Sequence, residues 1–206
     1  MIFSIIIPHY DKAISDERFI ACLDSLLNQS FKDFEVLLYH DGSLNRPLSE
    51  EVATRIIKLG TKMRIVPFKG VWGHNLRDLG IKEARGEYII HLNSDNVLFD
   101  LRDLIIAISE SGFMPVYIFR LIMVGVITIN HKTTLFRTMN PADKLILNGV
   151  PKPNHIDCMQ LVAKREVWLS RGGWNDLSKN SDGLIYEDIC KKYPYHNSKI
   201  VIGEHW

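Results

Sequence analysis

Cysteine is scarce in this chain, with three residues among 206. Cys22, Cys158 and Cys190 are far apart, odd in number and without the close spacing of metal ligands. This pattern argues against both a disulfide scaffold and a cysteine-based zinc site. We therefore expect the protein to work in a reducing, cytoplasmic setting.

An excess of charge of one sign is also missing, because the net charge is only +1. This balance gives no electrostatic reason to expect a nucleic acid or an anionic membrane as partner. Long hydrophobic runs are absent as well. The run at the start ends at Pro8, and the run over 116–129 contains Arg120 and is shorter than a bilayer requires. We expect neither a signal peptide nor a transmembrane segment.

The composition that remains is typical of a globular protein, with 46% hydrophobic and 24% charged residues. In the first half, β-prone runs alternate with runs of helical spacing. The predicted strands are 2–7, 34–39, 64–67 and 88–92, and the predicted helices are 19–27, 48–59, 75–84 and 101–109. Such alternation predicts an α/β fold with a mainly parallel central sheet flanked by helices.

The pattern changes after residue 111. We predict one or two strands over 116–129, then a polar stretch over 131–155, to which we assign substrate specificity. A strand over 159–163, a helix over 184–193 and a short strand over 200–202 complete the prediction. We interpret 1–206 as a single domain, in which 1–111 is a nucleotide-binding half and 112–206 an acceptor-side half.

The stretch 88–97, with the sequence YIIHLNSDNV, changes abruptly from apolar to polar. Ligands of open α/β sheets bind at the carboxyl ends of the strands, where Asn93, Ser94 and Asp95 are predicted to lie. A carboxylate there suits Mg²⁺ or Mn²⁺ together with a phosphorylated ligand. The alternative is a loop in which these side chains only satisfy a turn. Asp100 is predicted to cap the following helix.

Several motifs, taken in order, resemble the family 2 glycosyltransferases, whose fold is called GT-A. They are FSIIIPHYD at 3–11, SLLNQSFKDFEV at 25–36, DGS at 41–43, RDLGI at 77–81, ARGEYI at 84–89 with NSDN at 93–96, GGW at 172–174 and ED at 187–188. No single motif is specific, but their shared order and spacing are. The resemblance implies an inverting transfer of a sugar from a nucleotide donor to a hydroxyl group of a glycan or glycoprotein.

The resemblance also assigns residues to the donor. Pro8, Tyr10 and Asp41 would hold the nucleobase, with Tyr10 stacking on it and Asp41 accepting a base N–H. Uracil is favoured, and therefore a UDP-sugar, although a GDP- or dTDP-sugar is possible. Arg77 and Ser94 would contact the donor as well. Without the resemblance, the alternative for Asp41 is a turn residue before a glycine.

Asp95 matches the metal-binding acid of the family's DXD-type motif, which implies Mn²⁺ or Mg²⁺ as cofactor. Asn93 stands at the first acidic position of that motif, so it adds no charge but can still bind a ribose hydroxyl. His205 could return to the metal as a second protein ligand, although a lone histidine is usually just exposed.

For the acceptor side, Asp188 matches the family's catalytic base and would take the proton of the attacking hydroxyl. Glu187 would orient the acceptor, and Trp174 would stack on a sugar ring. Without the resemblance, the acidic pair is a solvated first helical turn, favoured by the helix dipole, and Trp174 is a core residue.

Other functions remain open. A nucleotidyltransferase that makes nucleotide-sugars would carry a Gly-rich, basic phosphate loop after the first strand, where this chain has PHYD. A dinucleotide-dependent oxidoreductase would carry G-x-G-x-x-G there, and that pattern is absent. A non-catalytic carbohydrate-binding domain is the third alternative, against which the presence of both Asp95 and Asp188 argues. The chain could also be the first domain of a longer enzyme.

Overall fold

The computed structural model describes residues 1–128, 135–138 and 140–206. The elements follow in the order β1 (Phe3–His9), α1 (Asp16–Leu27), β2 (Phe34–Asp41), α2 (Glu50–Lys58), β3 (Met63–Val66), α3 (His74–Glu83), β4 (Tyr88–His91), β5 (Val97–Leu98), α4 (Leu101–Glu110), β6 (Val116–Val124), β7 (Val126–Thr128), β8 (Leu135–Arg137), β9 (Lys144–Leu147), the 3₁₀ turn η1 (Cys158–Gln160), β10 (Leu161–Lys164), α5 (Arg165–Arg171), α6 (Ser181–Lys192) and β11 (Tyr195–His205).

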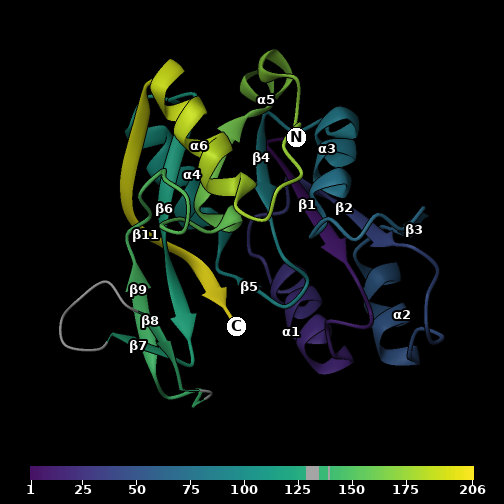
Figure 1. Cartoon of the computed structure of the whole chain (residues 1–206). Coiled ribbons are helices and arrows are strands. Elements are labelled where there is room, and N and C mark those ends of the chain that lie inside the picture. The colour runs from purple at the N-terminus through teal and green to yellow at the C-terminus, as the bar shows by residue number, and fades with distance from the viewer. Residues whose placement is uncertain (129–134, 139) are drawn as a thin grey trace.

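One large sheet connects the two halves of the chain in the order β3-β2-β1-β4-β10-β6-β11-β5, with β9 paired beside β6 (Figure 1). The strands β3, β2, β1 and β4 are parallel, as the alternation of strands and helices predicts. β10 is antiparallel to both β4 and β6, whereas β11 runs parallel to β6. β7 and β8 form a separate hairpin.

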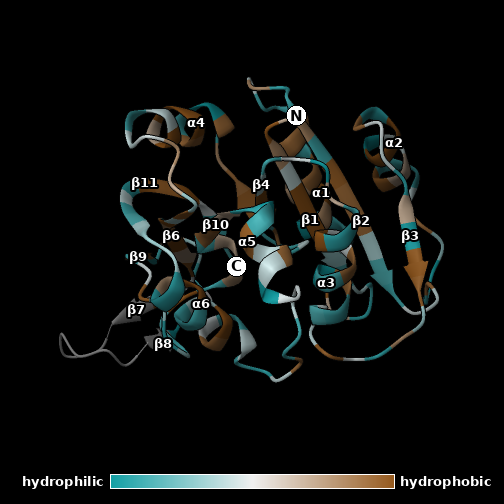
Figure 2. Ribbon diagram, turned by 90° about the horizontal axis from the view of Figure 1, so that it is seen from above, coloured by the Kyte–Doolittle hydropathy of each residue, from teal (hydrophilic) through white to brown (hydrophobic). Residues whose placement is uncertain are grey.

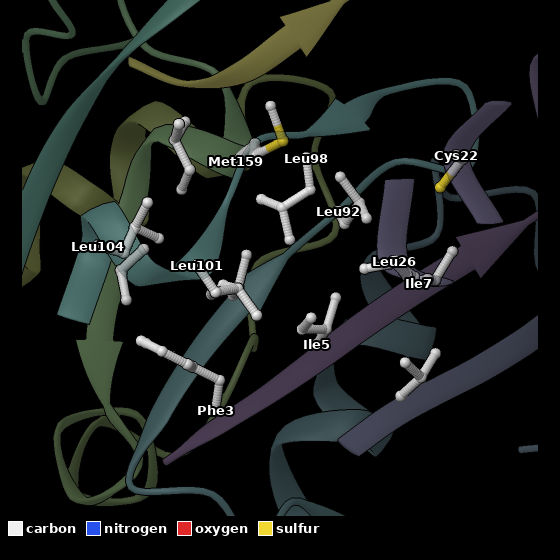
Figure 3. Close-up of a cluster of buried hydrophobic side chains, with 14 of the residues drawn as sticks. Phe3, Ile5, Ile7, Cys22, Leu26, Leu92, Leu98, Leu101, Leu104 and Met159 are labelled. Atoms are coloured by element: carbon white, nitrogen blue, oxygen red, sulfur yellow. The ribbon is translucent and has the colours of Figure 1, made fainter. Parts of the chain in front are cut away.

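Helices cover both faces of this sheet. On one face, side chains of β1 such as Phe3, Ile5 and Ile7 pack against α1, α2 and α4, and Figure 3 shows part of this core. On the other face, Ile6 packs against α3, and the core continues over α5 and α6. The strands of the sheet interior are therefore hydrophobic on both sides, as their brown colour in Figure 2 indicates.

Local sequence explains the helix boundaries on the first face. Ser15, Ser49 and Asp100 cap α1, α2 and α4 by accepting hydrogen bonds from backbone N–H groups of the first turn. Such a cap stabilises a helix by about 1 kcal/mol. The cap predicted at Asp100 is confirmed. On the second face, α3 can lie close to β1 because Gly80 has no side chain. A Cβ at this position would come within 2.5 Å of Ile6.

The largest differences from the sequence prediction lie in the second half. The helix predicted over 184–193 begins earlier, at Ser181, and the last strand is much longer than predicted. The polar stretch 131–155 contains β8 and β9, while residues 131–134 and 139 within it, and Ile129 of the strand prediction, lie outside the described residues. No helix in the described ranges has the length and hydrophobicity needed to cross a bilayer.

Candidate active site

A cavity of about 610 Å³ lies where β1, β2 and β4 end. The predicted site residues that line it are Pro8, Tyr10, Asp41, Arg77, Asn93, Ser94 and Asp95. Apart from Arg77, which lies on α3, they are brought together because neighbouring parallel strands carry their carboxyl ends to the same edge of the sheet. The cavity wall does not include Trp174, Glu187, Asp188 or His205, which the sequence prediction also placed in the site.

Tyr10, Asp41 and Phe68 form one end of the cavity. Asp41 is 5% exposed, and its two carboxylate oxygens accept hydrogen bonds of 3.0 Å from the backbone N–H groups of Lys69 and Gly70. Asp41 is thus more than a residue of its own turn, because it holds the loop between β3 and α3 against the end of β2.

Arg77 also lines the cavity and is only 2% exposed. Its guanidinium donates to Oδ1 of Asn93, to Sγ of Cys158 at 3.3 Å and to the carbonyl of Trp72 at 2.9 Å. All three acceptors are neutral. Asn93 therefore orients Arg77 without cancelling its charge, as an aspartate at this position would, and a buried positive charge is left facing the cavity.

Asp95 lines the cavity beside Asp157, a residue that the sequence prediction did not include. Burial raises the pKa of Asp95, while the nearby His205 lowers it and Asp157 raises it. His205 lies on β11, and its Nδ1 is 3.4 Å from Oδ2 of Asp157 and has no hydrogen-bond partner among the residues that the structure describes. Asp157 caps the turn η1 with a capping box that also includes Gln160.

These three side chains have the donor atoms that a hard divalent cation takes, namely carboxylate oxygens and an imidazole nitrogen. Within the described part of the chain, however, no three His, Cys, Asp or Glu side chains are grouped closely enough to hold a metal ion by themselves. The residues therefore fit a metal only if a ligand supplies further oxygen atoms.

Asp182 is the acid that α6 presents to the cavity. Burial raises its pKa, an effect opposed by the hydrogen bond of 2.8 Å that it accepts from the N–H of Gly183 and reinforced by Asp157. Gly183 allows this helix to pack closely against Pro153, because it has no side chain. A Cβ there would come within 2.4 Å of the backbone of Pro153. Asp182 was missed because the predicted helix began two residues after it, at Leu184.

Asp188 and Glu187 lie inside α6 rather than at its start, so the prediction that they open the helix is wrong. Asp188 makes ion pairs with Arg171 at 3.3 Å and Lys192 at 3.1 Å, and Glu187 makes one with Lys191 at 2.9 Å. About one and a half turns of helix separate this pair from the cavity-lining acid. The pair belongs to the charged outer surface of α6.

Trp174 has 1% of its surface exposed and therefore lies in the core, as the alternative interpretation of this residue predicts. Its ring stacks on Trp168 and His74, with centroid distances of 5.6 and 5.3 Å. Its Nε1 donates to Oγ of the buried Ser181 at 2.9 Å. Because Ser181 is the first residue of α6, Trp174 supports the position of the neighbouring Asp182.

Ser94 is oriented by a histidine that the sequence prediction did not single out. Nδ1 of His9 and Oγ of Ser94 form a buried hydrogen bond of 2.9 Å, and the His9 ring stacks on Phe19 at 4.0 Å. Burial, with the nearby His40, lowers the pKa of His9 to about 4. His9 is therefore neutral at physiological pH and ties the end of β1 to the residue that precedes Asp95.

The sequence model of the family described as Glycosyl transferase family 2 matches residues 4–163 of this chain. The chain belongs to glycosyl transferase family 2. This match covers the strand ends that form the cavity and confirms the resemblance found in the motifs.

Curated relatives in bacteria agree with the family. An uncharacterized glycosyltransferase of Bacillus subtilis, EpsJ, is 37% identical over 94 residues, which are 45% of this chain and 26% of that protein. The amylovoran biosynthesis glycosyltransferase AmsB of Erwinia amylovora is 33% identical over 95 residues, or 46% of this chain and 31% of that protein. The matched part thus spans about a quarter to a third of these relatives.

Solved structures confirm the GT-A fold. S. aureus TarS has a TM-score of 0.74 at 17% identity, over 99% of this chain and 36% of the TarS chain. TarS 1–349 in complex with UDP-GlcNAc has a TM-score of 0.72 at 17% identity, over 100% and 58% of the two chains. The mannosyltransferase PcManGT of Pyrobaculum calidifontis, in complex with GDP-Man and Mn²⁺, has a TM-score of 0.62 at 14% identity, over 98% and 56%.

Proposed function

We propose that this domain transfers a sugar from a nucleoside diphosphate donor, with a UDP-sugar favoured, to a hydroxyl group of a glycan or glycoprotein acceptor, with inversion at the anomeric carbon. The observation that carries the proposal is that one cavity contains a base-binding end, a buried cation and two separate acids. These are Tyr10 with Asp41, Arg77, Asp95 and Asp182. Family membership and the UDP-GlcNAc complex of TarS support the choice of donor.

The donor would lie along the cavity from the base to the sugar. Tyr10 stacks on the base and Asp41 accepts one of its N–H groups, as the N3–H of uracil requires. Arg77 would then face the diphosphate, and its charge is strong there because the side chain is buried and its hydrogen-bond acceptors among the described residues are neutral. Asn93 orients this guanidinium and offers its amide to the ribose.

A divalent metal, Mn²⁺ or Mg²⁺, would be held by Asp95, with Asp157 and His205 close enough to contribute. When bound, it would neutralise the charge that develops on the leaving diphosphate. Oxygen atoms of the diphosphate would supply further ligands, because the described residues contain no group of three His, Cys, Asp or Glu side chains that could hold a metal ion. The Mn²⁺ complex of PcManGT supports a metal in this fold.

The general base is assigned to Asp182 and not to Asp188, which the sequence prediction had favoured. It faces the cavity, whereas Asp188 is engaged by Arg171 and Lys192 on the outer side of α6. Burial raises the pKa of Asp182, so its carboxylate accepts a proton more readily than that of an exposed aspartate. It would take the proton of the acceptor hydroxyl as the oxygen attacks the anomeric carbon.

The function is tested by titrating UDP into the protein with and without Mn²⁺ in a calorimeter. We expect Mn²⁺ to tighten UDP binding to the wild type by about tenfold or more, since charge neutralisation by a metal is worth several kcal/mol. Asp95→Ala should bind UDP weakly and equally in both conditions. Asp103→Ala, which changes an exposed acid in the first turn of α4, is the matched control and should behave as the wild type does. An unchanged metal effect in Asp95→Ala would contradict the metal assignment.

A further inference from the structure

Phe68 lines the cavity although 59% of its surface is exposed. It follows β3 in the loop that leads to α3, and no sequence motif pointed to it. A large aromatic side chain that stays exposed on a cavity wall loses the hydrophobic stabilisation that burial would give. A flat apolar ligand in the cavity would restore that stabilisation.

The ring of Phe68 lies next to the ring of Tyr10, the residue assigned to base stacking, in a tilted arrangement. Their centroids are 5.6 Å apart and their planes make an angle of 30°. A planar base that stacks on both rings needs about 7 Å between them, because each stacked pair is separated by about 3.5 Å. The gap is therefore too narrow for a base by roughly 1–2 Å, and the loop has to move outward to admit one.

Two glycines next to Phe68 leave space for its ring, and the loop that carries Phe68 is hydrogen-bonded to Asp41. A Cβ at Gly42 would lie 2.9 Å from Cβ of Phe68, and one at Gly70 would lie 3.0 Å from its Cζ. Both glycines have positive φ, at 88° and 64°. The hydrogen bonds from Lys69 and Gly70 to Asp41 then connect the loop directly to the acid that would accept the base N–H.

We propose that Phe68 is the second wall of the nucleobase subsite, so that the loop moves outward and the base is bound between Tyr10 and Phe68. This inference rests on the proposed function and adds to it a residue that determines donor affinity. Stacking uses the face of the base and not its edge, so Phe68 contributes affinity while Asp41 contributes selectivity among bases.

The test compares UDP with inorganic pyrophosphate, which shares the diphosphate but has no base, by calorimetry in the presence of Mn²⁺. In Phe68→Ala the Kd for UDP should rise about 5- to 100-fold, the usual loss when a stacking ring is removed. The Kd for pyrophosphate should stay within about twofold of the wild-type value. Phe68→Tyr, which keeps the ring, should bind UDP almost normally. Ile65→Ala, on β3 and 57% exposed but outside the cavity wall, is the control and should change neither Kd.

Two results would overturn the inference alone: equal UDP affinity in wild type and Phe68→Ala, or an equal loss for UDP and pyrophosphate, which would mean that the loop is merely damaged. A wild-type protein that binds neither UDP nor GDP would overturn the proposed function as well. Because Phe68 is largely exposed, the melting temperature of Phe68→Ala should match that of the wild type, so a folding defect is easily recognised.

Discussion

Asp182→Asn is expected to reduce kcat for sugar transfer by about 10²–10⁴, the usual contribution of a positioned general base. The amide keeps the size of the side chain and the hydrogen bond from the N–H of Gly183 but cannot accept a proton at neutral pH. Donor binding should survive, because the nucleotide is assigned to Tyr10, Asp41 and Arg77. The measurement is kcat together with the donor Kd, with the anomeric configuration of the product determined by NMR.

Asp188→Asn is the matched control, since it makes the same change on the same helix but outside the cavity. Its ion pairs with Arg171 and Lys192 are partly exposed, and such pairs contribute about 0–1 kcal/mol. We expect its kcat to stay within about threefold of the wild-type value. A large loss in Asp188→Asn with normal transfer by Asp182→Asn would reverse the assignment, and a product with retained configuration would contradict the mechanism.

Trp174→Ala is expected to lower the free energy of unfolding by about 3–5 kcal/mol, as other deletions of fully buried large aromatic side chains do. The change removes the stacking on Trp168 and His74 and leaves Oγ of Ser181 without its indole donor. For a domain of this size, such a loss lowers the melting temperature by roughly 6–20 °C. Thermal unfolding followed by circular dichroism measures it.

Trp72→Ala is the control for this prediction, because it removes the same side chain from a position that is 60% exposed. Its melting temperature should stay within about 2 °C of the wild-type value. If Trp174→Ala were as stable as Trp72→Ala, the buried packing described for Trp174 would be incorrect. Equal stability combined with a raised KM for the acceptor would instead favour the sugar-stacking role that the motif first suggested.

The donor side of the site was predictable from sequence because its residues lie at the ends of strands. The buried runs before Pro8, Asp41 and Asn93 are long enough to identify as strands, and the geometry of parallel sheets then brings their ends together. The same argument gave the parallel order of the first half. Family resemblance supplied roles for these residues but was not needed to place them side by side.

The acceptor side was less predictable because single residues there depend on tertiary contacts. Gly183 is a poor helix former, so local propensity placed the start of α6 after it, whereas close packing against Pro153 keeps it inside the helix. Asp157 lies just past a polar stretch without periodicity and reaches the cavity through its capping turn. Whether Trp174 is exposed or buried depends on neighbours that are distant in the sequence, such as His74, which lies one hundred residues earlier.

The position of β10 in the sheet has a consequence for how the protein folds during synthesis. β4 is fully buried, yet one of its two neighbours is β10, which is made more than 70 residues later. β5 likewise pairs with β11, the last strand. When only the first half has left the ribosome, β4 has an unpaired apolar edge, of the kind that joins other chains in aggregates. Non-local pairings of this sort also slow folding, so this interval of exposure is long for a domain of this size.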